Sequence, residues 1–409
     1  MKKNISLVFV SLIFLILLPK TIISANIKMT KPDVNDAIPV TAIVNSQMEL
    51  DTPSAVLIEG STGTVLYEKN KDEKLKPASV TKIMTLLLIF EAIDSGQISL
   101  IDDVTVSDHA ASMGGSQVFL EPYEVQNVET MIKCISIASA NDASVAMAEH
   151  IAGSEEEFVA RMNARAKELG MNNTNFINCS GLDADNHYTT AYDIAIMSKE
   201  LVTRFPQISN YSTVWMDTFV HTTRKGRTEF GLTNTNKLIK SYNGITGLKT
   251  GSTSQAKYCL SATARRNNMD LIAVIMAAPD TKTRFREAAK LLNYGFANYS
   301  IYVDDNKDII IEPVRVTKGV SDLVGGKVKG DFSFLCSKGK SSENIRKELV
   351  LYDKVSAPVT IEDKIGEIIY YYDNEKIGSV DILALESIDK AGYIDSLVKS
   401  LKKFFIANK

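Results

Sequence analysis

The most informative segment of this 409-residue sequence is Pro77-Ala-Ser-Val-Thr-Lys-Ile-Met-Thr-Leu-Leu-Leu-Ile-Phe90. Its apolar residues from Ile83 onward recur at spacings dominated by three and four, which is typical of a well-buried helix. Ser79 comes two residues after Pro77, where this pattern begins. We therefore predict that Ser79 lies at the start of a helix that packs in the core of the protein.

The segments around this helix alternate between strand-like and helix-like patterns. Upstream, strands over 54–59 and 64–67 are predicted to form a hairpin around the turn 60–63. Downstream, the pattern predicts helical regions over 120–151, 155–169 and 190–201, then strands that include 249–251, 258–264 and 271–277, and a final helix over 284–299. This order favours a mixed α/β (α+β) fold, in which helices flank a sheet assembled from both ends of the segment.

The residue pattern of the sequence changes near residue 301. Short strand-like segments separated by Gly, Asp and Asn indicate a small all-β domain. Strands are predicted over 309–311, 348–352, 359–361, 367–372 and 376–382. The chain then ends in one helical stripe of apolar residues, which are Ile394, Leu397, Val398, Leu401, Phe404 and Phe405.

The N-terminal residues are typical of a secretory signal. Lys2 and Lys3 precede an apolar run over 5–18, and the small residues Ser24 and Ala25 could end such a signal. The run is short for a membrane-spanning helix, which needs roughly 20 apolar residues, although an uncleaved signal anchor is an alternative. We predict a signal peptide over 1–25, an extended tether over 26–48, and export of the protein.

The composition argues against several classes of function. With 46 basic and 49 acidic residues the formal net charge is −3, so no overall positive field would attract nucleic acid. The four cysteines are too few and too scattered for a disulfide scaffold and are expected to be buried thiols. The histidines form no metal-binding motif, and no Gly-x-Ser-x-Gly motif presents a serine for a Ser-His-Asp triad. We expect neither a metal nor a cofactor.

Three short motifs occur in one order, Ser79-Val-Thr-Lys82, Ser139-Ala-Asn141 and Lys249-Thr250-Gly251. Each alone has a purely structural interpretation, such as a helix cap followed by a surface lysine. Residues three apart lie on one face of a helix, so Lys82 is expected beside Ser79. A serine hydroxyl needs an adjacent proton acceptor, which a neutral lysine can be. If Lys249 reaches the same pocket, its charge would favour neutral Lys82 and attract an anionic substrate.

The start of a helix also offers free backbone N–H groups, which stabilise developing negative charge. The Ser79 amide is expected to form half of an oxyanion hole. The Ser252 amide, directly after Gly251, would form the other half. Because Gly251 lacks a side chain, it would permit close approach of a substrate backbone.

Longer stretches around these motifs resemble the low-molecular-weight penicillin-binding proteins of the D-alanyl-D-alanine carboxypeptidase group, which are serine-type and peptidase S11-like. The resemblance covers most of residues 50–300 and rests on 76–85, 139–142 and 247–251, with support from 181–183, 187–191 and 234–238. It implies a penicillin-binding/β-lactamase-like serine transpeptidase fold, with an antiparallel sheet flanked by helices and a helical subdomain. The implied limits are 49–300 for the catalytic domain, 301–383 for the small β-domain and 384–409 for a C-terminal amphipathic helix.

The resemblance also implies a role for each motif. Ser79 would be acylated by the penultimate D-alanine of a peptidoglycan stem peptide, and Lys82 would accept the serine proton. In the Ser139-Ala-Asn141 motif, the serine would relay protons to the leaving amine and the asparagine would hydrogen-bond the substrate backbone. Lys249 and Thr250 would bind the terminal carboxylate. β-Lactams would acylate the same serine.

The last helix is similarly implied to be a membrane anchor, which would place the protein at the outer face of the cytoplasmic membrane, in the cell wall space. Its sequence suits this location through the basic residues Lys399, Lys402, Lys403 and Lys409 and the aromatic residues Phe404 and Phe405. The alternative is a helix that packs on the protein's own β-domain. Gly392 is expected to limit the helix on its N-terminal side.

Two positions depart from the family pattern. Many relatives carry a histidine or proline where this chain has Asn178-Cys-Ser-Gly181, which leaves the substrate contacts of that loop open. Ser252 occupies a variable position that would tune the rate of deacylation.

Two rival functions follow from the same motifs. A serine β-lactamase shares all three, and Glu168-Leu-Gly-Met-Asn172 has the Glu-x-x-x-Asn spacing of the deacylating loop in class A enzymes. Gly170 is expected to end the helix that carries Glu168, which favours a solvated helix residue instead. The other rival is a catalytically silent wall-binding scaffold, against which the complete set of motif side chains argues.

Overall fold

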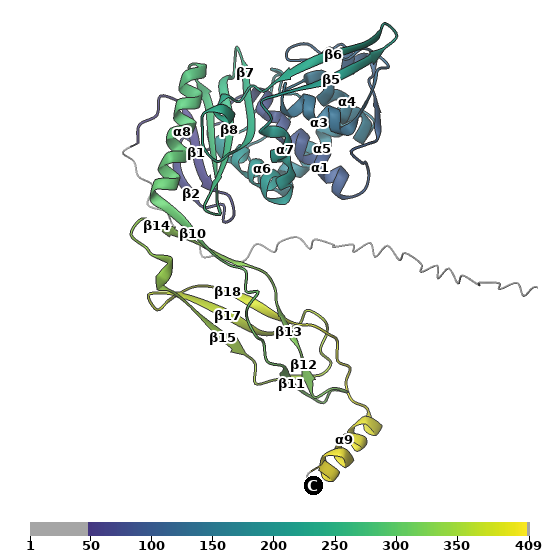
Figure 1. Cartoon of the computed structure of the whole chain (residues 1–409), viewed down its shortest axis with the longest axis vertical. Coiled ribbons are helices and arrows are strands. Elements are labelled where there is room, and N and C mark those ends of the chain that lie inside the picture. Colours follow the sequence, from purple (N-terminus) through teal and green to yellow (C-terminus); the bar gives the residue numbers. More distant parts are fainter. Residues whose placement is uncertain (1–47, 407–409) are drawn as a thin grey trace, which may run out of the picture. The chain divides into compact units, whose positions relative to one another are not determined.

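The computed structural model describes residues 48–406, with residues 402–406 as backbone only. The predicted signal peptide and nearly all of the tether lie outside these described residues. The central element is an antiparallel sheet with the strand order β2-β1-β9-β8-β7 (Figure 1). Its strands are β1 (Ser54–Glu59), β2 (Val65–Lys69), β7 (Ile245–Thr253), β8 (Lys257–Arg266) and β9 (Met269–Ala278). The predicted assembly of the sheet from both ends of the segment is confirmed.

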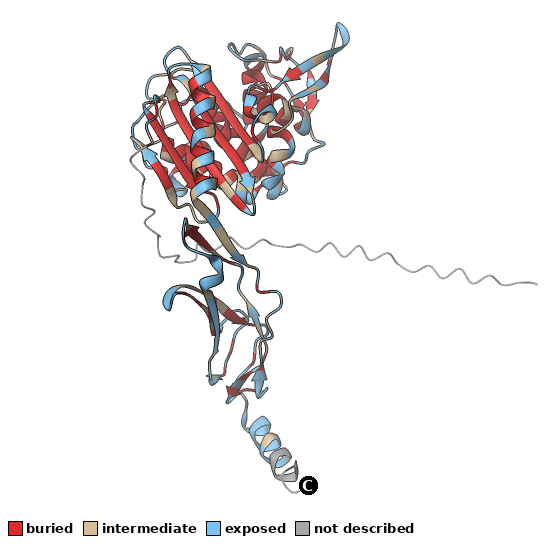
Figure 2. Ribbon diagram, turned by 60° about the vertical axis from the view of Figure 1, so that its left-hand side comes forward, coloured by how far each residue is buried: buried red, intermediate tan, exposed pale blue. Residues whose placement is uncertain are grey.

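Helices bury both faces of this sheet. Along β1, Val56 and Ile58 belong to one hydrophobic core, whereas Ala55 and Leu57 belong to another. The second core is covered by α8 (Thr281–Asn298), which lies over the buried strands in Figure 2. The first core lies against α6 (Ala191–Arg204) and α1 (Lys82–Asp94). Alternate side chains of a strand point to opposite faces, so a strand that is apolar throughout requires cover on both sides.

A mostly helical subdomain is inserted between the two parts of the sheet. Its helices are α2 (Asp108–Ala111), α3 (Val128–Ser136), α4 (Asn141–Ala152), α5 (Glu155–Glu168) and α7 (Ser209–Ser212), with the 3-10 helices η1 (Ala78–Thr81), η2 (Pro206–Ile208) and η3 (Lys237–Lys240). Two small antiparallel sheets accompany them, β3 (Asp103–Thr105) with β4 (Val125–Asn127) and β5 (Met216–Thr223) with β6 (Gly226–Thr233).

The prediction of one helical region over 120–151 is wrong at its start and in its middle. Residues 125–127 form β4, and α3 begins only at Val128. The chain leaves α3 after Ser136 and re-enters a helix only at Asn141. Ser139 lies between the two helices with a positive φ of 61°, a conformation that no α-helix contains. The apolar periodicity runs through the break because both helices bury their side chains in the same core.

The segment after residue 299 forms the predicted β-domain. Its strands are β10 (Tyr299–Asp304), β11 (Val314–Thr317), β12 (Leu323–Val324), β13 (Gly326–Val328), β14 (Phe332–Ser337), β15 (Ile345–Leu351), β16 (Lys354–Ser356), β17 (Lys364–Tyr372) and β18 (Glu375–Ala384), with η4 (Ser342–Asn344). The strands predicted over 309–311 and 359–361 are wrong. Ile309, Ile311 and Val359 pack on the core of this domain without joining a strand. Their apolar character therefore reports burial, and Val359 forms only an isolated bridge with Ile388.

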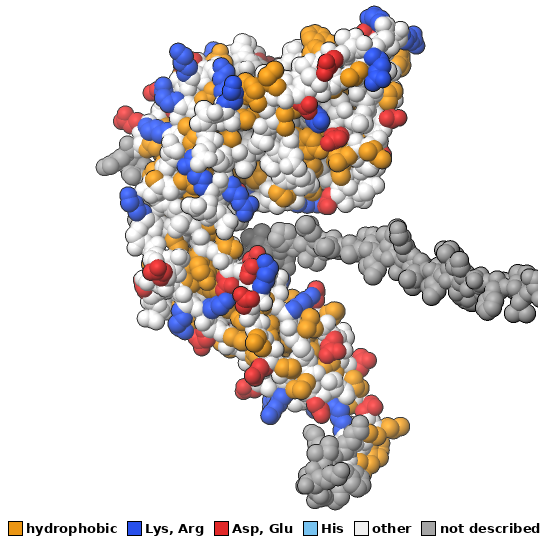
Figure 3. Space-filling view, viewed as in Figure 1, with side chains coloured by type: hydrophobic (Ala, Val, Ile, Leu, Met, Phe, Trp, Pro, Cys, Tyr) orange, Lys and Arg blue, Asp and Glu red, His pale blue; other side chains and the backbone are white. Residues whose placement is uncertain are grey.

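The last helix, α9 (Tyr393–Ile406), begins directly after Gly392, as predicted. Ile394, Leu397 and Leu401 are exposed by 75%, 52% and 50%, so these side chains do not pack on the β-domain. Hydrophobic side chains gather at this end of the molecule in Figure 3. Among the described residues, no helix combines the length and the apolarity that a membrane-spanning segment requires.

The assignment of Lys399 to anionic headgroups needs correction. Its ammonium group donates to Asp322 Oδ1 at 2.6 Å and to the Gly319 carbonyl at 2.7 Å. Both acceptors belong to the β-domain, so Lys399 lies on the side of α9 that faces this domain. The side chains of Lys402, Lys403, Phe404, Phe405 and Lys409 lie outside the described residues.

Candidate active site

Ser79 and Lys82 lie side by side where η1 continues into α1. Ser79 is in the 3-10 helix rather than in the α-helix that was predicted to begin at this residue. A 3-10 helix repeats every three residues, so the expected pairing is kept. The distance from Lys82 Nζ to Ser79 Oγ is 3.1 Å, which is hydrogen-bond length.

Lys82 is fully buried, and its amine is surrounded by oxygen acceptors. Its ammonium group donates to Asn141 Oδ1 at 2.6 Å and to the Ser180 carbonyl at 2.6 Å. Burial lowers the pKa of Lys82 to about 7, although Cys179 and Asp142 act in the opposite direction. The largest cause is therefore burial, and not the neighbouring cation that the sequence led us to emphasise. Loss of solvation makes the charged form unfavourable.

Strand β7 brings Lys249 to the same cluster. Lys249 Nζ donates to Ser139 Oγ at 2.8 Å and to the Thr250 carbonyl at 3.1 Å. Burial lowers the pKa of Lys249 well below its ordinary value, and the charges of Lys82 and Arg284 lower it further. The structure thus brings all three sequence motifs together, as their order in the sequence led us to expect.

Two glycines allow the backbone segments of the site to touch. A Cβ atom on Gly251 would lie 2.9 Å from Ser79 N and 2.9 Å from Pro77 O. A Cβ atom on Gly181, whose φ is +86°, would collide with the Ala78 carbonyl oxygen. The space that a Gly251 side chain would fill is taken by η1, and the close approach of a substrate backbone to Gly251 stays a prediction. The exposed Ser252 follows Gly251 at the end of β7.

Three residues of the site received no role from the sequence, although Asp142 and Ser180 lie in stretches that it singled out. Arg284, from α8, is buried and donates to the Gly251 carbonyl at 3.1 Å, while its Nε has no partner among the described residues. Ser180 contributes only its carbonyl oxygen to Lys82, so its side chain gives no signal. Asp142 is buried directly after Asn141. The loop 178–181, which departs from the family pattern, therefore supports the lysine.

Several other sequence candidates lie outside this cluster. The Glu168 side chain is 66% exposed and bonds Arg165 at 3.2 Å, as predicted for a solvated helix residue. All four cysteines are buried and free, which confirms that prediction. Within residues 48–406, no group of three or more His, Cys, Asp or Glu side chains could hold a metal ion.

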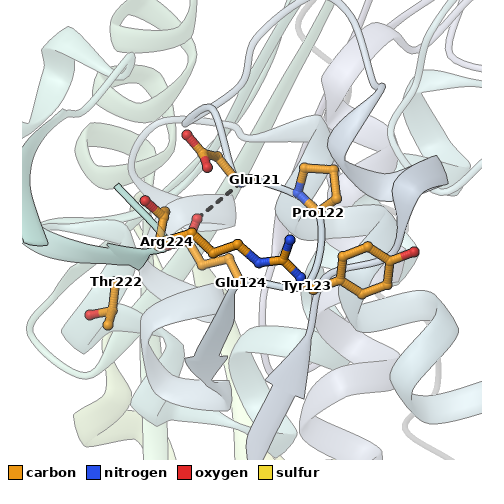
Figure 4. A pocket seen from close by; sticks show the side chains of 7 residues that line it. Glu121, Pro122, Tyr123, Glu124, Thr222 and Arg224 are labelled. Carbon is orange, nitrogen blue, oxygen red and sulfur yellow. Dashed lines mark hydrogen bonds between the residues drawn. The ribbon is translucent and has the colours of Figure 1, made fainter. Parts of the chain in front are cut away.

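A surface hollow also lies apart from the cluster. It is bordered by the turn 121–124 and by residues 222–224 at the end of β5, and Figure 4 shows Glu121, Tyr123 and Arg224 around it. None of the motif residues lines it. The three sequence motifs therefore meet in the cluster at η1, α4 and β7, and not at this hollow.

Comparison with known proteins gives one consistent result. Residues 41–280 match the peptidase S11 family, described as D-alanyl-D-alanine carboxypeptidase, and residues 296–390 match the C-terminal domain of penicillin-binding protein 5. The chain is 45% identical to the D-alanyl-D-alanine carboxypeptidase DacF of Bacillus subtilis, over 87% of this chain and 90% of that protein. It is 30% identical to DacA of Escherichia coli, over 90% and 92% of the two chains.

A solved structure shares the architecture. Penicillin-binding protein 5 from Haemophilus influenzae superposes with a TM-score of 0.70 at 31% identity, covering 85% of this chain and all of that one. The expected transpeptidase-like fold followed by an all-β domain is therefore confirmed.

Proposed function

The chain belongs to the D-alanyl-D-alanine carboxypeptidase family of serine peptidases, and from this premise we propose that Ser79 attacks the peptide bond between the last two D-alanines of a peptidoglycan stem peptide. The observation that carries the proposal is the 3.1 Å contact between Ser79 Oγ and the buried Lys82 amine. With a pKa near 7, a large fraction of Lys82 is neutral at physiological pH and able to accept the serine proton.

The first step is acylation. Ser79 Oγ forms a bond to the carbonyl carbon of the penultimate D-alanine while its proton passes to Lys82 Nζ. The backbone N–H groups of Ser79 and Ser252 stabilise the negative charge that develops on the carbonyl oxygen. The contact of Gly251 with η1 supports this pairing, because it holds the end of β7 against the serine.

The second step is departure of the terminal D-alanine. Ser139 relays to the leaving amine the proton that Lys82 took from Ser79, which returns Lys82 to its neutral form; the Ser139 hydroxyl lies 2.8 Å from Lys249 Nζ. Asn141 hydrogen-bonds the substrate backbone. Lys249 and Thr250 bind the terminal carboxylate, and the buried charge of Arg284 adds to the positive potential behind β7. Water then hydrolyses the acyl-enzyme, and β-lactams acylate Ser79 by the same attack.

A direct test combines a peptide and a penicillin. The protein is expected to release one free D-alanine from a synthetic stem pentapeptide, and a fluorescent penicillin is expected to label it once per molecule with a long-lived adduct. Mass spectrometry of the intact protein measures the adduct, and a D-alanine assay measures the release. A wall-binding scaffold would release no D-alanine, and a β-lactamase would turn over penicillin rapidly; either result would contradict the proposal.

We further propose that the protein is exported and works at the outer face of the cytoplasmic membrane. Lys2, Lys3 and the apolar run over 5–18 support export. The exposed apolar side chains of α9 support attachment to the membrane surface, where they could enter the boundary between headgroups and acyl chains. We place the junction between the β-domain and the anchor near Ala391, since Ile388 is buried in the domain core and pairs with Val359.

Removal of residues 392–409 tests the anchor. The truncated protein is expected to move from the membrane fraction to the soluble fraction, because the apolar side chains of α9 are lost. Its turnover of a soluble pentapeptide should stay within about twofold of the full chain, since no residue of the active-site cluster is removed. Fractionation by ultracentrifugation and a D-alanine assay measure the two effects. If the truncated protein still sediments with membranes, α9 is not the anchor.

A further inference from the structure

The buried carboxylate of Asp142 is a prominent group that the proposed reaction does not use. Asp142 lies in the first turn of α4, directly after Asn141, and is 0% exposed. Its Oδ2 accepts hydrogen bonds from the backbone N–H groups of Val118 and Leu120, both at 3.1 Å. Its Oδ1 accepts from the N–H of Ala143 at 2.9 Å. The carboxylate therefore binds the backbone of the loop 114–120, which precedes it by more than twenty residues.

The same loop also holds Asn141. The backbone N–H of Asn141 donates to the Ser116 carbonyl at 2.7 Å, and its side-chain Nδ2 donates to the Gly114 carbonyl at 2.7 Å. Because Nδ2 is engaged in this way, the amide is oriented with Oδ1 toward Lys82 Nζ, at 2.6 Å. Thus Asn141 binds carbonyl groups of the loop, and Asp142 binds N–H groups of the loop.

We propose that Asp142 is a positioning residue for the carboxypeptidase reaction. Its carboxylate fixes the loop 114–120 in the place from which Gly114 orients the Asn141 amide toward Lys82. The proposal rests on the function assigned to Lys82 above. A carboxylate suits this task because both of its oxygens accept hydrogen bonds, and a charged acceptor binds N–H groups more strongly than a neutral one.

The loop needs such an attachment for two reasons. It contains the consecutive glycines Gly114 and Gly115, which lose more conformational freedom on ordering than other residues do. It also has neither helix nor strand hydrogen bonds of its own. Val118 and Leu120 bury their side chains, so the apolar core and the carboxylate hold the loop together. A small shift of the Gly114 carbonyl would release the Asn141 amide and, with it, one acceptor of Lys82.

A purely structural function for Asp142 must be distinguished from a positioning function, because a carboxylate in the first turn also stabilises a helix. Asp193 offers a matched control. It is likewise buried, lies in the first turn of α6, and accepts from the Asn173 N–H at 2.9 Å and the Thr174 hydroxyl at 2.7 Å. None of these partners belongs to the active-site cluster.

The test compares Asp142→Asn with Asp193→Asn in the full chain. An asparagine at position 142 would turn an NH₂ group toward N–H donors. For Asp142→Asn we expect a loss of about 10- to 100-fold in the second-order rate of acylation by a penicillin, counted per folded molecule, because a displacement of about 1 Å costs rates of this order. For Asp193→Asn we expect less than about a twofold change at a similar loss of thermal stability. Hydrogen–deuterium exchange at Val118 and Leu120 should accelerate only in Asp142→Asn.

Two outcomes with the variants would overturn the proposal. One is a wild-type acylation rate in folded Asp142→Asn, and the other is an equal loss of acylation rate in Asp193→Asn. The unaltered protein provides a test that needs no folded variant, since rapid exchange of the Val118 and Leu120 amides would show that the carboxylate does not hold the loop. If the protein neither binds penicillin nor releases D-alanine, the proposed function fails, whereas the exchange result still reports on the loop.

Discussion

Replacement of Ser79 by alanine is expected to abolish both labelling by penicillin and release of D-alanine. The variant retains Lys82 and the rest of the buried cluster, but it has no oxygen that can form an ester with the substrate. Loss of the nucleophile in an enzyme of this type lowers turnover by roughly 10⁴-fold or more. Intact-protein mass spectrometry should show no penicillin adduct, and a D-alanine assay with a pentapeptide should show no release above the uncatalysed rate.

Ser198→Ala is a suitable control for this experiment. Ser198 is a buried serine, whereas Ser79 is half-buried, and the Ser198 hydroxyl pairs with Ser261 Oγ at 2.8 Å and not with Lys82. The control should lose about 1 kcal/mol of stability and keep its activity. An adduct or D-alanine release in Ser79→Ala would remove Ser79 from the mechanism.

Replacement of Lys82 by methionine is expected to have the second largest effect. Methionine fills a similar volume without an amine, so the serine loses its proton acceptor. General base catalysis is worth about 10²- to 10⁴-fold, and acylation by penicillin should fall by that amount. Stopped-flow or quenched labelling measures the rate, and thermal unfolding shows whether the variant is folded.

The pH dependence of acylation provides a second readout for Lys82. Burial lowers the pKa of Lys82 to about 7 from the ordinary 10.5, so the neutral, basic form is present above about pH 7. The acylation rate of the unaltered protein should therefore rise about tenfold per pH unit below this value and level off above it. In Lys82→Met the acylation rate should not rise with pH in this range. A similar rise in the variant would assign the ionisation to another group.

Lys199→Met is the matched control for Lys82→Met. Burial also lowers the pKa of Lys199, but this lysine lies beside Gly63 at the hairpin of β1 and β2. Its replacement should leave both the acylation rate and its pH dependence unchanged. A comparable loss in this control would mean that removal of any buried lysine disturbs the protein.

Much of the fold could be predicted from local patterns. The helix after Ser79, the hairpin at its N-terminal side, the strands β8 and β9, and the helix α8 each have an apolar periodicity that reports directly on burial. The same reasoning failed where apolar residues pack on a core without belonging to a strand. Ile309 and Val359 are such residues, although Val359 forms an isolated bridge with Ile388.

The environment of the site was less predictable than its members. Residue spacing placed Lys82 beside Ser79, but the charge state of Lys82 depends on how completely the folded chain removes water from it. Gly251 was recognised as special, yet the group that it accommodates, the backbone of η1, comes from more than 170 positions earlier. Arg284 and the Ser180 carbonyl gave no signal at all.

The sequence by itself determined which groups are available for chemistry and their spacing along the chain: a serine and a lysine three residues apart, a Ser-x-Asn motif and a Lys-Thr-Gly motif. Only the tertiary structure decided that these groups meet in one cluster, that burial brings the pKa of Lys82 to about 7, and that Asn141 and Ser180 bind its amine. The physical reason is that spacing within a helix is set by local backbone geometry, whereas desolvation and hydrogen-bond partners come from segments distant in the sequence.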